Sequence, residues 1–248
     1  MQPTKPDEPF LLAADLDGTL LGDAQGEAEF KEFVQAYRNS IRLAFVTGRY
    51  LFSVRDVVES GRLPVPDYVC VNVGTEIFAW QDEQNLIGRK YAARVSPDWD
   101  LEKIYQLGVG EGVWLQDFGE LQPPFQGGFF WDGKDESLDA MRLRLTDRHQ
   151  YRILPSYGEY IDVLPTGFGK GETVRFLQQE LGLDPGRVVV AGDAGNDIEM
   201  FETGFKGILP VNALDELKAV ARPPLHYQSP LPSARGVLDG LRHFGLVE

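Results

Sequence analysis

FLLAADLDGT, at Phe10–Thr19, is the stretch from which the architecture of this chain follows. Its first five residues are apolar, which predicts a short buried strand. The strand ends abruptly at Asp15, Asp17 and Gly18. In an open parallel sheet, ligands bind at the carboxyl ends of the strands. The two aspartates therefore mark a candidate site, and other strand ends are expected to supply its neighbours.

Apolar strands and amphipathic helices alternate on both sides of a central segment. Beyond the first strand, we expect strands at Arg42–Thr47, Asp67–Asn72, Arg187–Ala191 and Gly207–Pro210. The helices expected around them are Glu27–Tyr37, Tyr50–Glu59, Lys170–Leu181, Asn196–Thr203, Leu214–Val220 and Ala234–Phe244. This alternation predicts an α/β fold with a Rossmann-like parallel-sheet core.

The central segment has a different pattern. Tryptophan, glycine and proline are frequent there, and the expected strands are short: Val113–Leu115, Gly128–Trp131, Tyr151–Leu154 and Tyr160–Val163. Helices are expected at Asp98–Leu107 and Glu136–Arg148. Strands and helices that do not alternate regularly predict a small α+β domain. We therefore expect a core domain of residues 1–79 and 165–248 and an inserted α+β cap of residues 80–164.

Composition narrows the possible functions. The 248 residues carry a net charge of −14, so nucleic acid is not an expected partner, and the acidic surface favours a monomer. No apolar run approaches the roughly 20 residues of a membrane helix, so no membrane association is expected. Met1–Pro9 lacks a signal pattern, which predicts a cytosolic protein. One cysteine and three scattered histidines exclude a cysteine or histidine metal cluster.

Acidic side chains follow two of the predicted strands. Asp15 and Asp17 follow the first, and Asp193 and Asp197 follow Arg187–Ala191. Carboxylates packed at one sheet edge repel one another, and a divalent cation relieves that repulsion. Magnesium prefers such oxygen ligands, so Mg²⁺ is the expected cofactor. The alternative is that these aspartates only cap turns and helices, and that the negative charge serves solubility.

The order of these residues resembles the haloacid dehalogenase superfamily. Asp15-Leu16-Asp17-Gly18-Thr19, then Thr47 after a strand, then Lys170, then Gly192–Asp197 look like its four motifs. The insert lies between the second motif and Lys170, which resembles the α+β type of cap in that superfamily. The resemblance implies a phosphatase that works through an aspartyl-phosphate intermediate.

The same resemblance implies catalytic roles for four residues. Asp15 attacks phosphorus, and Asp17 protonates the leaving oxygen and then deprotonates the attacking water. Thr47 donates its hydroxyl to a phosphate oxygen, and Lys170 balances the negative charge. The metal residues implied are Asp15, Asp17, Asp193 and Asp197. The substrate-binding residues implied are Gly18, Gly48, Arg49, Glu76 and Asn196, with a surface role as the alternative for Arg49.

A closer resemblance concerns the substrate. Val73–Ile77, Asp162–Pro165, Val211–Ala213 and the C-terminal segment from His226 look like the sucrose-phosphatase branch of the superfamily. It implies that Glu76 accepts hydrogen bonds from sugar hydroxyls. Phe125–Asp132 contains no lysine, and Glu159 stands where that branch typically carries lysine. Phe129-Phe130-Trp131 either stacks on a sugar or belongs to the cap core.

The predicted function is a magnesium-dependent phosphatase of a small-molecule sugar phosphate. The expected substrate is a disaccharide or glycosyl phosphate of the sucrose 6-phosphate or mannosylfructose phosphate type. One alternative is a hexose-phosphate or broad-range phosphatase. Another is a non-catalytic regulator that binds a sugar phosphate, although a binder needs no nucleophile such as Asp15.

Overall fold

Two compact units make up the chain. The protein's structure, a computed structural model, describes residues 9–145, 151–156 and 158–247. The first unit runs up to Gly88 and resumes at Lys170, and the second unit is Arg89–Gly169. The first unit is thus split in sequence, as the interrupted alternation of strands and helices indicates.

A seven-stranded sheet organises the first unit, with the strand order β11-β10-β9-β1-β2-β3-β4. Strands β11 to β3 are parallel, whereas β4 at the edge is antiparallel to β3. The α/β class with a parallel-sheet core is confirmed. The edge strand β4 and the strand β11 are additions to the predicted elements. The strands are β1 (Phe10–Ala14), β2 (Ile41–Val46), β3 (Tyr68–Val71), β4 (Glu76–Ala79), β9 (Val188–Ala191), β10 (Lys206–Leu209) and β11 (His226–Gln228).

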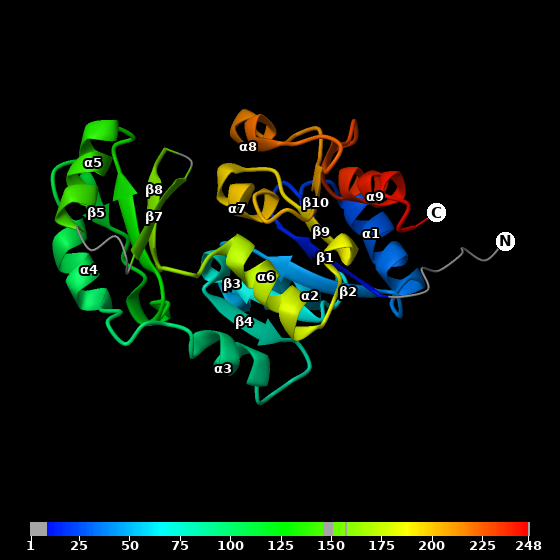
Figure 1. The fold of residues 1–248 in the computed structure, drawn as a ribbon, viewed down its shortest axis with the longest axis horizontal. Helices are drawn as coiled ribbons and strands as arrows, with labels where there is room; N and C mark the ends of the chain where they lie inside the picture. Colours follow the sequence, from blue (N-terminus) through cyan, green and yellow to red (C-terminus); the bar gives the residue numbers. More distant parts are fainter. Residues whose placement is uncertain (1–8, 146–150, 157, 248) are drawn as a thin grey trace. The chain divides into compact units, whose positions relative to one another are not determined.

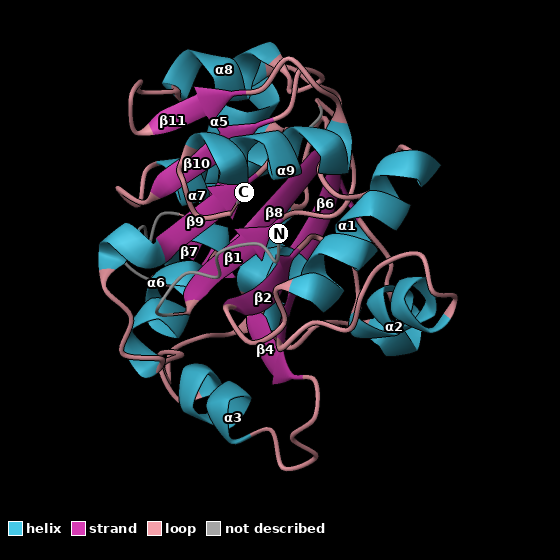
Figure 2. Cartoon of the chain, turned by 90° about the vertical axis from the view of Figure 1, so that its right-hand side faces the viewer, coloured by secondary structure: helices cyan, strands magenta, loops and turns pink. Residues whose placement is uncertain are grey.

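Helices cover both faces of this sheet (Figures 1 and 2). One face packs against α1 (Ala24–Ala36), α2 (Leu51–Glu59) and α9 (Ser233–His243), whose apolar residues join those of the strands in one core. The helices α6 (Lys170–Glu180) and α7 (Ile198–Phe201) lie on the opposite face. All residues of β1 and β9 are buried, as expected for strands covered on both faces. The remaining elements of this unit are α8 (Asp215–Val220) and the short 3₁₀ turns η1 (Asn72–Gly74), η3 (Pro185–Arg187) and η4 (Gly195–Asp197).

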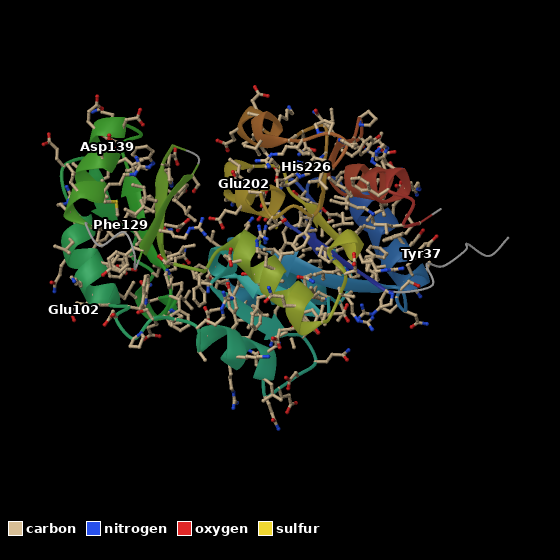
Figure 3. The ribbon with its side chains drawn as sticks, in the orientation of Figure 1. Tyr37, Glu102, Phe129, Asp139, Glu202 and His226 are labelled. Atoms are coloured by element: carbon tan, nitrogen blue, oxygen red, sulfur yellow. The ribbon has the colours of Figure 1, made fainter. Side chains whose placement is uncertain are left out.

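The second unit is an antiparallel sheet with helices on one face. Its strand order is β5-β6-β8-β7, and α4 and α5 pack against it around Phe129, which Figure 3 labels. Its elements are β5 (Val113–Leu115), β6 (Gly127–Trp131), β7 (Tyr151–Ser156), β8 (Tyr160–Pro165), α4 (Leu101–Gly108), α5 (Asp135–Arg144) and η2 (Gly119–Leu121). The helix α3 (Leu86–Ala92) crosses the boundary between the units. Of the helix expected at Glu136–Arg148, residues 146–148 lie outside the described part.

The two junctions between the units differ from the predicted boundaries. Residues 80–88 belong to the first unit, because β4 extends its sheet and Asn85 hydrogen-bonds to Ile77 and Ala79 of that strand. Residues 165–169 belong to the second unit, where the Phe168 ring packs 4.7 Å from that of Tyr91. Both differences arise from contacts that local sequence patterns do not report.

The aromatic run in β6 divides between the two faces of its sheet. Phe129 is fully buried, and Trp131 packs against the same core. Phe130 points the other way, is partly exposed, and lies 5.5 Å from the ring of Tyr160. Successive side chains of a strand alternate in direction, so a single run serves both faces. The core interpretation therefore holds for Phe129 and Trp131.

No helix in the described part of the chain is both long and apolar enough to span a bilayer.

Candidate active site

The carboxyl ends of three neighbouring strands meet at one edge of the first sheet. Asp15 follows β1, Thr47 follows β2, and Asp193 lies just beyond β9. The backbone N–H of Asp15 donates to the carbonyl of Ala191 at 3.0 Å, so β1 and β9 end level with each other. Because adjacent strands lie about 4.8 Å apart, side chains at these ends are close enough to interact.

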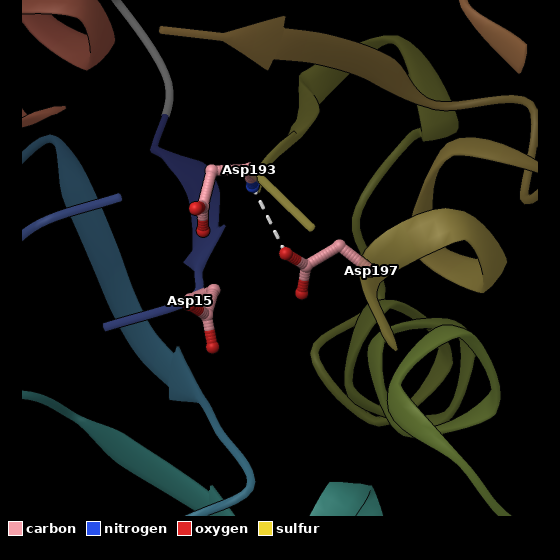
Figure 4. Close-up of side chains that lie close together, drawn as sticks. All are labelled: Asp15, Asp193 and Asp197. Carbon is pink, nitrogen blue, oxygen red and sulfur yellow. Dashed lines mark hydrogen bonds between the residues drawn. The ribbon is translucent and has the colours of Figure 1, made fainter. Parts of the chain in front are cut away.

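Three carboxylates form a compact acidic cluster at this edge. One oxygen from each of Asp15, Asp193 and Asp197 lies within 4.8 Å of the others (Figure 4). The three residues are only 5%, 9% and 0% exposed, respectively. Lys170, at the first position of α6 and fully buried, donates to Asp15 Oδ1 and Asp197 Oδ1, both at 2.7 Å. A single lysine thus bridges two of the three carboxylates.

The charges in the cluster are not balanced. Burial raises the pKa of Asp15 to about 8, and Asp197 and Asp193 add to this while Lys170 opposes it. Burial, followed by the charge of Asp197, raises the pKa of Asp193 to about 6. Burial alone would lower the pKa of Lys170, but Asp15 and Asp197 outweigh that effect and raise it. The lysine therefore stays charged, and the site accommodates further positive charge.

The hydrogen bonds of the three carboxylates distinguish their roles. Asp197 uses both oxygens, since Oδ1 accepts from Lys170 and Oδ2 accepts from the backbone N–H groups of Asp193 and Ala194. Asp193 Oδ1 accepts from Thr19 Oγ1 at 3.0 Å. Among the described residues, no donor reaches the second oxygen of Asp15 or of Asp193. These two oxygens are free to bind an incoming group, whereas Asp197 holds the Asp193 loop in place.

Thr19 is a site residue for which the sequence motifs predicted no role. It lies within the DLDGT stretch and is fully buried, with its hydroxyl on Asp193. Its position in that stretch is the only sequence signal that pointed to it.

Gly18 is required by close packing against the cluster. Its φ of +77° lies in the left-handed region, and a Cβ on it would sit 2.2 Å from Asp193 Oδ2. The Gly18 carbonyl accepts a hydrogen bond from Asn212 Nδ2 at 2.8 Å. A side chain at this position would displace the Asp193 carboxylate.

Asp17 was predicted to be one of the metal residues. Its carboxylate lies outside the acidic cluster that Asp15, Asp193 and Asp197 form. Its side chain is 56% exposed and pairs with Arg49, whose Nε and Nη2 donate to its two oxygens at 2.7 and 2.5 Å. The two bonds from Arg49 hold the Asp17 carboxylate toward the turn after β2 and apart from the cluster that contains Asp15. Arg49, predicted to contact substrate, is occupied by Asp17 and by Ser53.

The remaining predicted residues line the same sheet edge. Thr47 is buried, and its Oγ1 accepts from the Arg49 backbone N–H at 3.1 Å, which leaves the hydroxyl hydrogen to donate elsewhere. Gly48 is exposed beside it. Asn196, in η4, has a buried Oδ1 without a hydrogen-bond partner among the described residues.

Glu76 lies at the start of β4, three strands from Asp15. Its Oε2 accepts a hydrogen bond from Asn72 Nδ2 at 2.6 Å. Burial raises the pKa of Glu76, and the bond from Asn72 opposes that effect.

Comparison with known proteins identifies the family. The family model described as sucrose-6F-phosphate phosphohydrolase matches residues 8–245. The chain belongs to this sucrose-phosphatase family. One solved structure, the sucrose-phosphatase of Synechocystis sp. PCC6803 in complex with sucrose and phosphate, superposes with a TM-score of 0.86 at 28% identity. The match covers 96% of this chain and 98% of that one. The predicted membership of the haloacid dehalogenase superfamily, in its sucrose-phosphatase branch, is confirmed.

Two relatives that match almost all of this chain are named as phosphatases of sugar phosphates. The mannosylfructose-phosphate phosphatase of Agrobacterium fabrum is 32% identical over 244 residues, covering 95% of this chain and 97% of the relative. The probable sucrose-phosphatase 3a of Arabidopsis thaliana is 26% identical, covering 96% of this chain and 60% of that protein. The chain is therefore a phosphoric monoester hydrolase, as predicted.

Proposed function

We propose that this phosphatase hydrolyses the phosphate monoester of a disaccharide or glycosyl metabolite of the sucrose 6-phosphate or mannosylfructose phosphate type. The observation that carries the proposal is the Lys170-bridged cluster of Asp15, Asp193 and Asp197 at the carboxyl edge of the sheet. The named substrates of the relatives support the sugar phosphate class. The cytosolic location and the monomeric state stay predictions.

Asp15 is the proposed nucleophile. Lys170 holds Oδ1, so the second oxygen is directed away from the lysine and is available to phosphorus. Attack forms the bond from aspartate oxygen to phosphorus and breaks the bond from phosphorus to the sugar oxygen. Water then attacks the aspartyl-phosphate and releases inorganic phosphate, which restores Asp15. Burial of Asp15 keeps competing solvent away from this oxygen.

Asp17 is the proposed proton carrier. It is the exposed carboxylate of the DLDGT turn, so it can reach both a leaving oxygen and a water molecule. It gives a proton to the sugar oxygen as that group departs, and it takes one from the attacking water afterwards. Arg49 orients the carboxylate between these steps through its two hydrogen bonds. Thr47 and Asn196 supply polar groups for the phosphate oxygens.

Mg²⁺ is the proposed cofactor, and the residues present fit it. The free oxygen of Asp193 and Oδ1 of Asp15, which keeps a lone pair beside the bond from Lys170, are hard ligands, and two protein carboxylates are a typical complement for Mg²⁺. When bound, the ion neutralises charge on the phosphoryl oxygens and orients the phosphoryl group. Asp197 positions Asp193 through the Asp193 backbone N–H. Gly18 leaves the space in which the Asp193 carboxylate lies.

A phosphate-release screen tests this function. The purified chain with Mg²⁺ is assayed on sucrose 6-phosphate, mannosylfructose phosphate, several hexose phosphates and p-nitrophenyl phosphate. We expect kcat/KM for one disaccharide phosphate to exceed that for every hexose phosphate by at least about tenfold. Equal values across the panel would instead support a broad-range phosphatase. No turnover of any ester would support the non-catalytic regulator.

A further inference from the structure

The loop that joins β3 to β4 adopts an unusual backbone conformation. Asn72, Val73 and Gly74 have φ values of +52°, +58° and +79°. Glycine adopts the left-handed region freely and asparagine tolerates it, but a β-branched valine is rarely found there. A strained conformation persists only where the surrounding structure holds it, and such strain is concentrated at functional sites.

Hydrogen bonds fasten this loop to the active-site edge. The Asn72 N–H donates to the carbonyl of Arg49, and the Val73 N–H donates to the carbonyl of Thr47, both at 3.1 Å. On the other side, Thr173 Oγ1 donates to the Gly74 carbonyl at 2.7 Å. Thr173 lies one turn after Lys170 in α6. The loop is therefore fixed between the phosphate-binding segment after β2 and the helix that carries the lysine.

The side chain of Asn72 is hydrogen-bonded at its nitrogen but not at its oxygen, among the described residues. The residue is 5% exposed, and Nδ2 donates to Glu76 Oε2, while Oδ1 is buried without a partner among the described residues. An unpaired buried oxygen is destabilising. Both the strain and the unpaired oxygen therefore act against stability. With this backbone and side-chain conformation, Asn72 makes its hydrogen bond to Glu76.

We propose that Asn72 is a positioning residue that orients Glu76 for recognition of the sugar. Its amide fixes Oε2, and among the described residues no donor reaches the other carboxylate oxygen, which is left for a hydroxyl of the substrate. Glu76 lies three strands from Asp15, about 14 Å along the sheet edge. It therefore meets a part of the substrate remote from phosphorus. This inference rests on the proposed function and assigns Asn72 a specificity role within it.

Two variants of Asn72 test this role. Asn72→Asp keeps the shape of the side chain but replaces the donor with a negative charge beside Glu76. Asn72→Gly removes the amide and the unpaired oxygen and suits the left-handed backbone. For both, we expect kcat/KM on the best sugar phosphate to fall about tenfold, with turnover of p-nitrophenyl phosphate within twofold of wild type. The melting temperature of Asn72→Gly should equal or exceed that of wild type.

Asn85→Asp is the matched control. Asn85 also has a left-handed φ, of +45°, and it hydrogen-bonds to β4, but it does so at Ile77 and Ala79. Asn85→Asp adds the same charge as Asn72→Asp. It should leave the ratio of sugar phosphate turnover to p-nitrophenyl phosphate turnover unchanged. In a Glu76→Ala background, Asn72→Asp should have no further effect on sugar phosphate turnover, because its action passes through Glu76.

Three results would overturn the proposal: unchanged sugar phosphate turnover in Asn72→Asp, an equal loss on both substrates, or full additivity with Glu76→Ala. A wild-type protein that hydrolyses p-nitrophenyl phosphate but prefers no sugar phosphate would instead overturn the proposed function. The wild-type screen and the Asn72 variants therefore distinguish the two failures.

Discussion

Arg49 donates one hydrogen bond to each carboxylate oxygen of Asp17, from Nε at 2.7 Å and from Nη2 at 2.5 Å. This planar two-point contact fixes the orientation of the carboxylate as well as its position. A lysine has the same charge but lacks the guanidinium fork. The pair connects the turn after β1 with the turn after β2.

Replacement of Arg49 tests whether the orientation of Asp17 matters. Hydrogen bonds to charged groups contribute about 1.5–3 kcal/mol, so Arg49→Ala should lower kcat by roughly ten- to a hundredfold. Arg49→Lys should recover only part of that loss. Steady-state kinetics on p-nitrophenyl phosphate measures both. Arg38→Lys is the control, because Arg38 forms the same fork with Asp67 away from the site and should leave kcat unchanged.

Asp15→Asn removes the proposed nucleophile while keeping its size. Turnover of every phosphate ester should fall at least about a thousandfold, in line with the loss of other covalent nucleophiles. The fold should be retained, as circular dichroism would show. Asp56→Asn, an exposed change in α2, is the control and should be fully active. A folded Asp15→Asn protein with near-normal turnover would assign the nucleophile to another residue.

Removal of divalent metal should abolish activity. Mg²⁺ should restore it after treatment with a chelator, and Ca²⁺ should restore it poorly because its coordination is larger and looser. Asp193→Asn weakens one of the two carboxylate ligands proposed for the ion, so the Mg²⁺ concentration for half-maximal activity should rise at least about tenfold. Full activity in excess chelator would contradict a metal site at the cluster.

Glu76→Ala should separate sugar recognition from phosphoryl chemistry. Loss of a charged acceptor should lower kcat/KM for the preferred sugar phosphate by about ten- to a hundredfold. The turnover of p-nitrophenyl phosphate, which has no sugar hydroxyl, should change little. If both fall together, Glu76 supports catalysis or folding rather than recognition.

Asp162 makes the stability of the second unit depend on pH. Burial raises its pKa from the ordinary value of 3.8 to about 6, with the hydrogen bond from Gln126 acting in the opposite direction. Between these values the folded state binds the proton more tightly than the unfolded state does. Stability from this group is therefore present below about pH 4 and is lost as the pH rises through about 6.

Asp162→Asn should remove that loss, since the amide oxygen can still accept from Gln126. The raised pKa corresponds to roughly 3 kcal/mol at pH 7. The gain in melting temperature should therefore be roughly 6–12 °C at pH 7 and close to zero at pH 4. Tryptophan fluorescence follows mainly this unit, because three of the four tryptophans, Trp99, Trp114 and Trp131, lie in it. The exposed Asp139→Asn in α5 is the control and should show no such pH dependence. An equal gain at both pH values would contradict the role of ionisation.

The sequence by itself determined the class of the fold and the edge at which the site lies. Asp15, Thr47 and Asp193 each follow an apolar strand, and parallel strands end at a common edge, so their convergence follows from local patterns alone. The family could also be predicted from the sequence, because the order of the motifs can be read directly from it. Each motif is a short continuous stretch whose residue types are fixed by its chemistry.

Only the tertiary structure decided where the individual side chains point. The pairing of Asp17 with Arg49, the bond from Thr19 to Asp193 and the placement of β4 beside β3 all join residues whose relation local periodicity does not encode. The contact between Asn72 and Glu76 depends on a left-handed loop that the sequence pattern does not favour, since valine disfavours it. Long-range packing outweighs local preference at these positions, because hydrogen bonds from distant segments hold the backbone there.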